Sequence, residues 1–169
     1  MKALSPLDRL ATWLATVFGI GLAPKAPGTF GSLPGLLVGA GVHVAAYRLC
    51  SDALPWARSF VILLLLALAT ALALWAIARA ETALATHDDQ RIVIDEVVGQ
   101  AIAVAFVPVA IWPYLLGFLL FRLFDITKPW LIGRVDKEVP GAVGTLGDDV
   151  LAGVIAGLIL VAVTTLVGF

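Results

Sequence analysis

Five carboxylates lie where long apolar stretches of the chain begin or end. Asp95 and Glu96 precede one stretch, Asp125 follows another, and Asp148 and Asp149 precede the last. If the stretches form a helical bundle, these acids meet at one end of it. Crowded carboxylates repel one another, and oxygen ligands favour Mg²⁺ or Mn²⁺ over zinc. The pattern therefore predicts a divalent metal site, the alternative being separate, solvated acids at helix ends.

A second candidate site is the segment of residues 26–32, APGTFGS, which precedes an apolar stretch. Its glycines, hydroxyls and helix-start N–H groups could hold an anion, and a neighbouring lysine adds positive charge. The same segment is also typical of a turn followed by a helix cap, which is the favoured interpretation when it is taken alone. The candidate phosphate-binding residues here are Lys25, Gly28, Thr29, Gly31 and Ser32.

A third candidate lies in residues 121–130, FRLFDITKPW. On a helix, Arg122, Asp125 and Lys128 recur at intervals of three and share a face. The acid could then hold a metal while the two bases bind a phosphate. The alternative is an Arg122–Asp125 pair beside basic side chains at a membrane edge.

The elements that must position these residues are membrane helices. Of the 169 residues, 61% are hydrophobic and 14% are charged, and the mean hydropathy is +1.03. A soluble domain of this size carries about 25% charged residues, so the bilayer is the better solvent. One cysteine excludes a disulfide scaffold, and 11 basic against 12 acidic residues disfavour nucleic-acid binding.

We expect an all-α fold, namely a polytopic helical membrane bundle forming one integral-membrane domain over residues 1–169. About five crossings are predicted, near 33–49, 59–78, 93–108, 112–125 and 149–168. A short re-entrant or interfacial helix is expected within residues 10–23. Pro108 and Pro113 indicate a hairpin between two shorter helices, and residues 129–147 are expected to form a loop.

The charges orient this bundle. Five crossings leave only Arg48 and Arg58 on one side, while the other nine basic residues and eleven of the acids share the opposite side. The excess of Lys and Arg predicts that the second side is cytoplasmic. The nine are Lys2, Arg9, Lys25, Arg79, Arg91, Arg122, Lys128, Arg134 and Lys137.

Four motifs, in order, resemble those of the A-type phosphatidylglycerophosphatases. They are PGTFGS at 27–32, DEVVG at 95–99, RLFDITKP at 122–129 and GTLGDDVLAG at 144–153, and the resemblance extends over about residues 26–157. It implies a Mg²⁺-dependent enzyme of the bacterial cytoplasmic membrane, with its active site on the cytoplasmic face. That enzyme would hydrolyse the terminal phosphomonoester of phosphatidylglycerophosphate to give phosphatidylglycerol and phosphate.

Within this resemblance, Mg²⁺, or alternatively Mn²⁺, is expected at Asp95, Glu96, Asp125, Asp148 and Asp149. Catalytic roles are expected for Asp95, Asp125, Asp149 and Lys128, and phosphate binding for Lys25, Gly28, Thr29, Gly31, Ser32, Arg122 and Lys128. Whether water or an aspartate attacks the phosphorus is left open, as is the oligomeric state.

Two other functions are weighed against this one. A small cation channel or transporter would carry its acids in the middle of the crossings, whereas these lie at their ends. A nucleotide-dependent lipid phosphotransferase would carry an Asp-Gly-x-x-Ala-Arg signature, which the sequence lacks.

Overall fold

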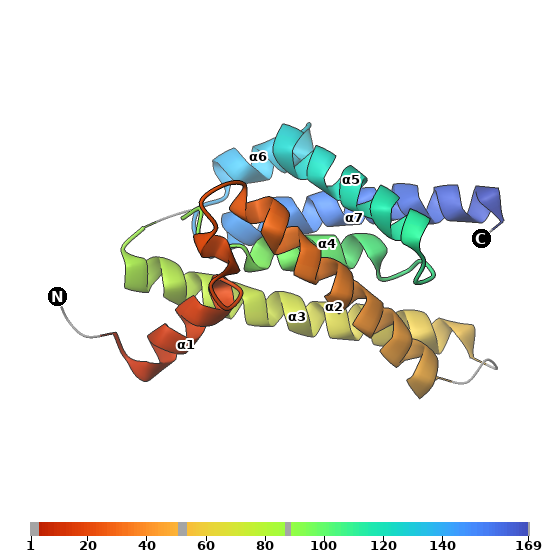
Figure 1. Cartoon of the computed structure of the whole chain (residues 1–169), viewed down its shortest axis with the longest axis horizontal. Coiled ribbons are helices and arrows are strands. Elements are labelled where there is room, and N and C mark those ends of the chain that lie inside the picture. Colours follow the sequence, from red (N-terminus) through yellow and green to blue (C-terminus); the bar gives the residue numbers. More distant parts are fainter. Residues whose placement is uncertain (1–3, 51–53, 87–88, 169) are drawn as a thin grey trace.

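The protein is all-helical in the computed structural model, which describes residues 4–50, 54–86 and 89–168. Seven α-helices and one short 3₁₀-helix lie within these ranges (Figure 1). In chain order they are α1 (Pro6–Ala15), η1 (Ile20–Leu22), α2 (Pro27–Leu49), α3 (Pro55–Leu84), α4 (Ile94–Val104), α5 (Ile111–Thr127), α6 (Leu131–Glu138) and α7 (Ala142–Val167).

Three of these helices are long and apolar enough to cross a membrane. They are α2, most of α3 (Trp56–Leu84) and α7, with 23, 29 and 26 residues. Many of their apolar side chains are exposed, including Leu37, Leu63 and Leu158. Such an outer surface is suited to a bilayer and not to water. The structure thus confirms a helical protein with three candidate spans, and the shorter α4 and α5 are not among them.

Several predicted boundaries are wrong. Helix α2 begins at Pro27, before the expected start near 33, because proline is well accommodated at the first position of a helix. The stretch 129–147 is mostly helical, since α6 and the first turns of α7 occupy it. Helix α6 carries few apolar residues and buries Ile132, so its amphipathic pattern is hidden in a hydropathy average. Two shorter helices take the place of one long helix there, as predicted, but only Pro108 lies between α4 and α5, since Pro113 lies in the first turn of α5.

Helix α4 lies at the centre of the bundle, between α2 and α7 (Figure 1). Glycines at helical spacing allow these helices to approach closely. A Cβ atom added to Gly35 would lie 2.6 Å from the Gln100 side chain, and one added to Gly99 would lie 2.6 Å from the Asp149 carbonyl oxygen. Close helix approach, not ligand binding, therefore explains these small residues.

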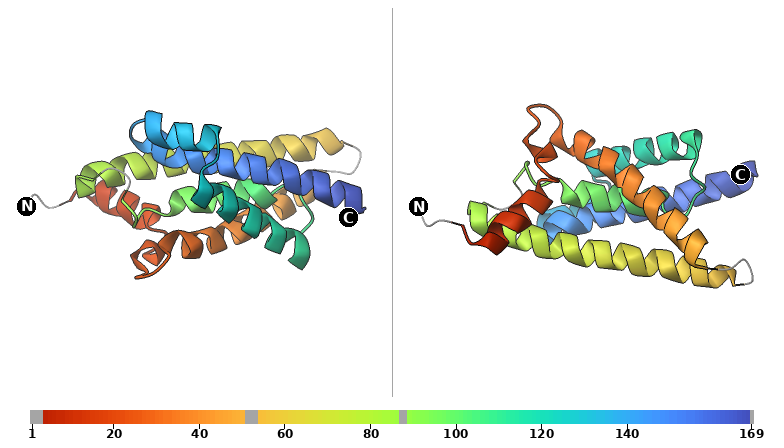
Figure 2. Two further views of the ribbon diagram at one scale, coloured as in Figure 1. Left: turned by 90° about the horizontal axis from the view of Figure 1, so that it is seen from above. Right: turned by 60° about the horizontal axis from the view of Figure 1, so that its bottom comes forward.

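The charged ends of the helices gather at one end of the bundle. In Figures 1 and 2, α2, α4 and α7 begin at the same end at which α3 and α5 finish, and α1 and α6 lie there too. Helix α1 packs on α3, and the Arg79 guanidinium lies 3.0 Å from the Asp8 carboxylate. The acids of α4, α5 and α7 are thereby placed at one end, as the sequence predicts.

Candidate active site

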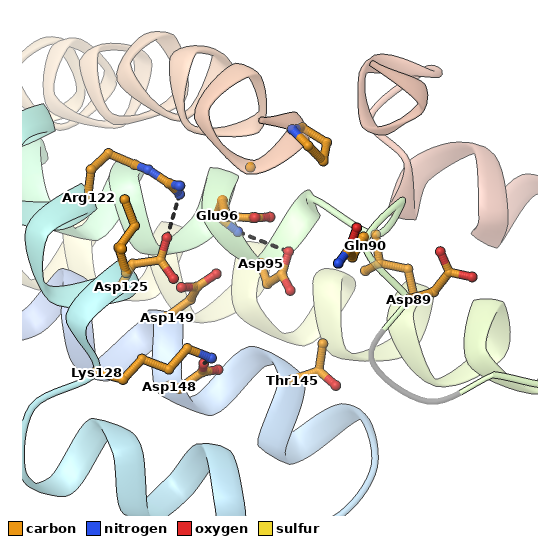
Figure 3. Close-up of a pocket in the computed structure, with 14 residues that line it drawn as sticks. Asp89, Gln90, Asp95, Glu96, Arg122, Asp125, Lys128, Thr145, Asp148 and Asp149 are labelled. Atoms are coloured by element: carbon orange, nitrogen blue, oxygen red, sulfur yellow. Dashed lines mark hydrogen bonds and ion pairs between the residues drawn. The ribbon is translucent and has the colours of Figure 1, made fainter. Parts of the chain in front are cut away.

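A cavity of about 320 Å³ opens at this charged end (Figure 3). Four segments supply its walls: the start of α2, the segment before α4 with the first turn of α4, the end of α5, and the first turns of α7. Its lining residues are Pro27, Gly28, Asp89, Gln90, Ile92, Asp95, Glu96, Arg122, Asp125, Ile126, Lys128, Thr145, Asp148 and Asp149. All five carboxylates singled out in the sequence are among them.

Three of these acids form a tight group in which Asp95 and Asp149 are buried and Glu96 is partly buried. Asp95 and Glu96 come from the first turn of α4, and Asp149 comes from the second turn of α7. One carboxylate oxygen of each lies within 4.8 Å of the others. Asp95 is 7% exposed and Asp149 is 4% exposed. Asp125, at the end of α5, lies beside Asp149 (Figure 3).

The acidic group has the chemistry of a metal site. Among the residues the structure describes, Glu96 Oε2, Asp148 Oδ1 and Asp149 Oδ1 are buried without a hydrogen-bond partner. Buried carboxylate oxygens without partners are costly, and a shared divalent cation removes both the repulsion and the unmet bonding capacity. Because the donors are all carboxylate oxygens, the site suits a hard cation. The residues present therefore fit the expected metal.

Two cationic side chains flank the acids. Arg122 is paired with Asp125, and its guanidinium also donates to Ser32 Oγ at 3.4 Å. Lys128 is paired with Asp136 and, at 2.6 Å, with Asp148. Partial burial lowers the pKa of Lys128, but its hydrogen bonds to the two aspartates outweigh that effect and raise the pKa above its usual range. Lys128 is thus held as a cation at the cavity edge.

Only part of the predicted phosphate-binding segment at the start of α2 reaches the cavity. Gly28 lines the cavity, and a Cβ there would lie 3.3 Å from the Arg122 guanidinium. Ser32 is fully buried and donates to the Gly28 carbonyl at 2.8 Å, while a Cβ on Gly31 would lie 2.8 Å from Val93. Of the predicted phosphate-binding residues, Lys25, Thr29, Gly31 and Ser32 do not line the cavity.

Other residues of the site were not singled out from the sequence. Thr145 lines the cavity, and its hydroxyl donates to Glu81 Oε1 at 2.9 Å. It precedes Asp149 by four positions, a helical spacing that could have revealed it. Asp89 also lines the cavity, where hydrogen bonds from the Arg91 side chain hold its pKa well below the usual range. Asp136 belongs to the helix that replaced the expected loop, so no local pattern pointed to its contact with Lys128.

Comparison with known proteins gives a consistent result. The family model described as phosphatidylglycerophosphatase A matches residues 13–164. The chain is 33% identical over 148 residues to phosphatidylglycerophosphatase A of Escherichia coli, which covers 87% of this chain and 79% of that protein. The Haemophilus influenzae protein of the same name is 34% identical over 164 residues, or 96% of this chain and 93% of that one.

A third relative carries a different name. A Bacteroides thetaiotaomicron protein, provisionally named a phosphatidylinositol-3-phosphatase, is 33% identical over 163 residues, covering 94% of this chain and 96% of that protein. No solved structure matches the chain. All three relatives are named for the removal of a phosphate from a phospholipid.

Proposed function

Because this chain belongs to the phosphatidylglycerophosphatase A family, we propose that its acidic cavity hydrolyses the terminal phosphomonoester of phosphatidylglycerophosphate. The products are phosphatidylglycerol and phosphate, in phospholipid biosynthesis. One observation carries this assignment to the cavity. Asp95, Glu96 and Asp149 lie close together, two of them have a buried oxygen without a partner, and two cationic side chains line the same cavity. That combination suits a metal and a phosphate side by side.

Asp95, Glu96 and Asp149 are the proposed metal ligands, with Asp125 and Asp148 completing the acidic surround. When bound, Mg²⁺ or Mn²⁺ supplies Lewis-acid polarisation of the phosphoryl oxygens and neutralises their charge. The first turn of α4 and the second turn of α7 bring the three ligands together, because the two helices approach closely at Gly99 and Gly153. Holding the ligands on rigid helices limits the reorganisation that phosphoryl transfer requires.

Arg122 and Lys128 are the proposed phosphate-binding cations. Both line the cavity, and each is paired with an aspartate that a bound phosphate can partly replace. Asp125 and Ser32 orient the Arg122 guanidinium, while Asp136 and Asp148 hold the Lys128 amino group. Such charge-assisted contacts to a developing negative charge are worth roughly 2–4 kcal/mol each in the transition state.

We propose that the charged end of the bundle lies at the cytoplasmic face of the bacterial inner membrane. Nine basic residues of the sequence fall on the side predicted to be cytoplasmic, and two fall on the other. With α4 and α5 as a hairpin of shorter crossings, the chain has five crossings and residues 1–169 form a single domain. The terminal phosphate of a membrane lipid then meets the cavity at the interface.

Phosphate release from defined lipids tests this function. The purified protein in neutral detergent micelles is given phosphatidylglycerophosphate, phosphatidic acid or phosphatidylinositol 3-phosphate, the last because of the Bacteroides relative. We expect the first to be the best substrate, activity to be lost in EDTA, and Mg²⁺ to restore it. Full activity in EDTA, or a preference for either other lipid, would contradict the proposal.

A further inference from the structure

A second hollow lies beside the cavity, at the start of α2. It measures about 610 Å³ and is lined by Gly19, Ile20, Leu22, Ala23, Pro24, Lys25 and Phe30. Its walls are apolar except for Lys25. Leu22 and Phe30 are 64% and 51% exposed, so the hollow opens onto a surface that suits the boundary between headgroups and acyl chains.

Lys25 differs from the cations of the active site. It forms no hydrogen bond or ion pair with any residue that the structure describes, whereas Arg122 and Lys128 are both held by aspartates. It also does not line the acidic cavity. An unpaired ammonium group in an otherwise apolar hollow at a membrane edge is suited to an anionic lipid headgroup.

The two hollows lie on opposite sides of the start of α2. Gly28 lines the acidic cavity and Phe30 lines the second hollow. Two residues that are two positions apart on a helix point about 200° apart around its axis. The Cα atoms of a helix lie on a cylinder about 5 Å across, and Gly28 adds no side chain to that width at the start of α2. Lys25 precedes Gly28 by three residues, which is at most about 10 Å along the chain.

This separation matches the chemistry of the substrate. Phosphatidylglycerophosphate carries a terminal phosphomonoester and an inner phosphodiester, joined by one glycerol. Six bonds separate the two phosphorus atoms, which places them roughly 6–8 Å apart. With the monoester among Asp95, Arg122 and Lys128, the diester reaches across the start of α2. The partial positive charge of that helix end favours both phosphates.

We propose that the hollow lined by Lys25, Leu22 and Phe30 binds the inner phosphodiester and adjoining acyl-glycerol of the substrate lipid, with Lys25 as the cation that recognises the diester. This inference rests on the proposed function. It makes Lys25 a specificity-determining residue that favours lipids bearing both a diester and a monoester over phosphatidic acid, whose single phosphate joins diacylglycerol directly.

The test compares wild type with the Lys25→Ala and Lys25→Arg variants in neutral detergent micelles. Two inhibitors separate the two subsites, because phosphatidylglycerol keeps the diester and lacks the monoester, while inorganic phosphate mimics the monoester alone. For Lys25→Ala we expect KM for phosphatidylglycerophosphate and Ki for phosphatidylglycerol to rise together, by roughly 5- to 30-fold. The kcat and the Ki of inorganic phosphate stay near wild type, and Lys25→Arg retains most of the affinity.

Lys137→Ala is the matched control, since Lys137 is another basic residue at the charged end and does not line either hollow. An unchanged KM in Lys25→Ala would overturn the inference. So would an equal rise in the Ki of inorganic phosphate, which would place Lys25 at the terminal phosphate. If wild type released no phosphate from phosphatidylglycerophosphate, the proposed function would fail instead. Direct binding of phosphatidylglycerol to wild type and Lys25→Ala would then test the diester site by itself.

Discussion

Replacing Gly153 with alanine should disable the acidic site without touching a carboxylate. Gly153 lies one turn after Asp149 on α7, and it faces Gly99, which lies one turn after Asp95 on α4. A Cβ on Gly153 would meet the Gly99 carbonyl group, at 2.9 Å from its carbon and 3.1 Å from the Gly99 Cα. Since carbon atoms normally pack at about 3.5–4.0 Å, the two helices must separate by roughly 1 Å.

That displacement directly increases the distance between the carboxylates of α4 and those of α7. A misplacement of about 1 Å can cost about 100-fold in rate, and overpacking costs about 1–3 kcal/mol of stability. We therefore expect Gly153→Ala to lower kcat/KM by about two orders of magnitude and to require more Mg²⁺ for half-maximal activity. Phosphate release over a Mg²⁺ titration, with thermal unfolding measured in parallel, gives both quantities.

Two further glycines make this a graded series. Gly41 on α2 has no atom within 4 Å of an added Cβ, so Gly41→Ala should keep full activity. A Cβ on Gly157 would lie 3.3 Å from the carbonyl oxygens of Ile102 and Ala103, which predicts an intermediate loss for Gly157→Ala. If Gly153→Ala kept wild-type turnover and Mg²⁺ dependence, the contact between Gly99 and Gly153 would not fix the distance between the carboxylates of α4 and α7.

The remaining predictions concern the charged groups. Asp149→Asn should remain folded but lose Mg²⁺-dependent turnover. If the variant were as active as wild type at the same Mg²⁺ concentrations, Asp149 would not be a metal ligand. Lys128→Ala should lose roughly tenfold to several hundredfold in kcat/KM while Lys137→Ala stays near wild type; equal activities would remove Lys128 from phosphate binding. Because the pKa of Lys128 is raised, its positive charge is fully present below its usual pKa of about 10.4 and is lost only at higher pH. Wild type and Lys128→Arg should therefore show parallel pH profiles of activity between about pH 7 and 10. Cysteines placed at Asp89 and Lys137 should be labelled only from the cytoplasmic side. Labelling of either from the outside would contradict the predicted topology.

Much of the site could be predicted from the chain because hydropathy and residue order constrain a membrane protein strongly. Each long apolar stretch carries the chain from one side to the other, so acids at the ends of alternate stretches return to the same face. The predicted meeting of Asp95, Asp125 and Asp149 at one end follows from this rule, and the structure confirms that they line one cavity. The oxygen-only donor set is likewise a property of composition.

The boundaries and some contacts could not be predicted in this way. Helix α6 and the first turns of α7 contain too few apolar residues to register in a hydropathy average, so residues 129–147 were expected to be a loop. As a result, the contact of Lys128 with Asp136 went unpredicted. Lys25 was expected at the same phosphate as Gly28, yet the two residues line different hollows. Lys25 precedes the helix, and the chain turns at Ala26, whose φ of 48° is left-handed, before α2 begins at Pro27.

The sequence by itself determined the class of fold, the family and the acidic end of the bundle, because these depend on hydropathy and on the order of the motifs. Only the tertiary structure decided which oxygens come together. Asp95 and Glu96 join Asp149 within 4.8 Å, while Asp125 is drawn into a pair with Arg122. Residues more than fifty positions apart reach such distances only through the close approach of α4 and α7, which the side chains absent at Gly99 and Gly153 permit.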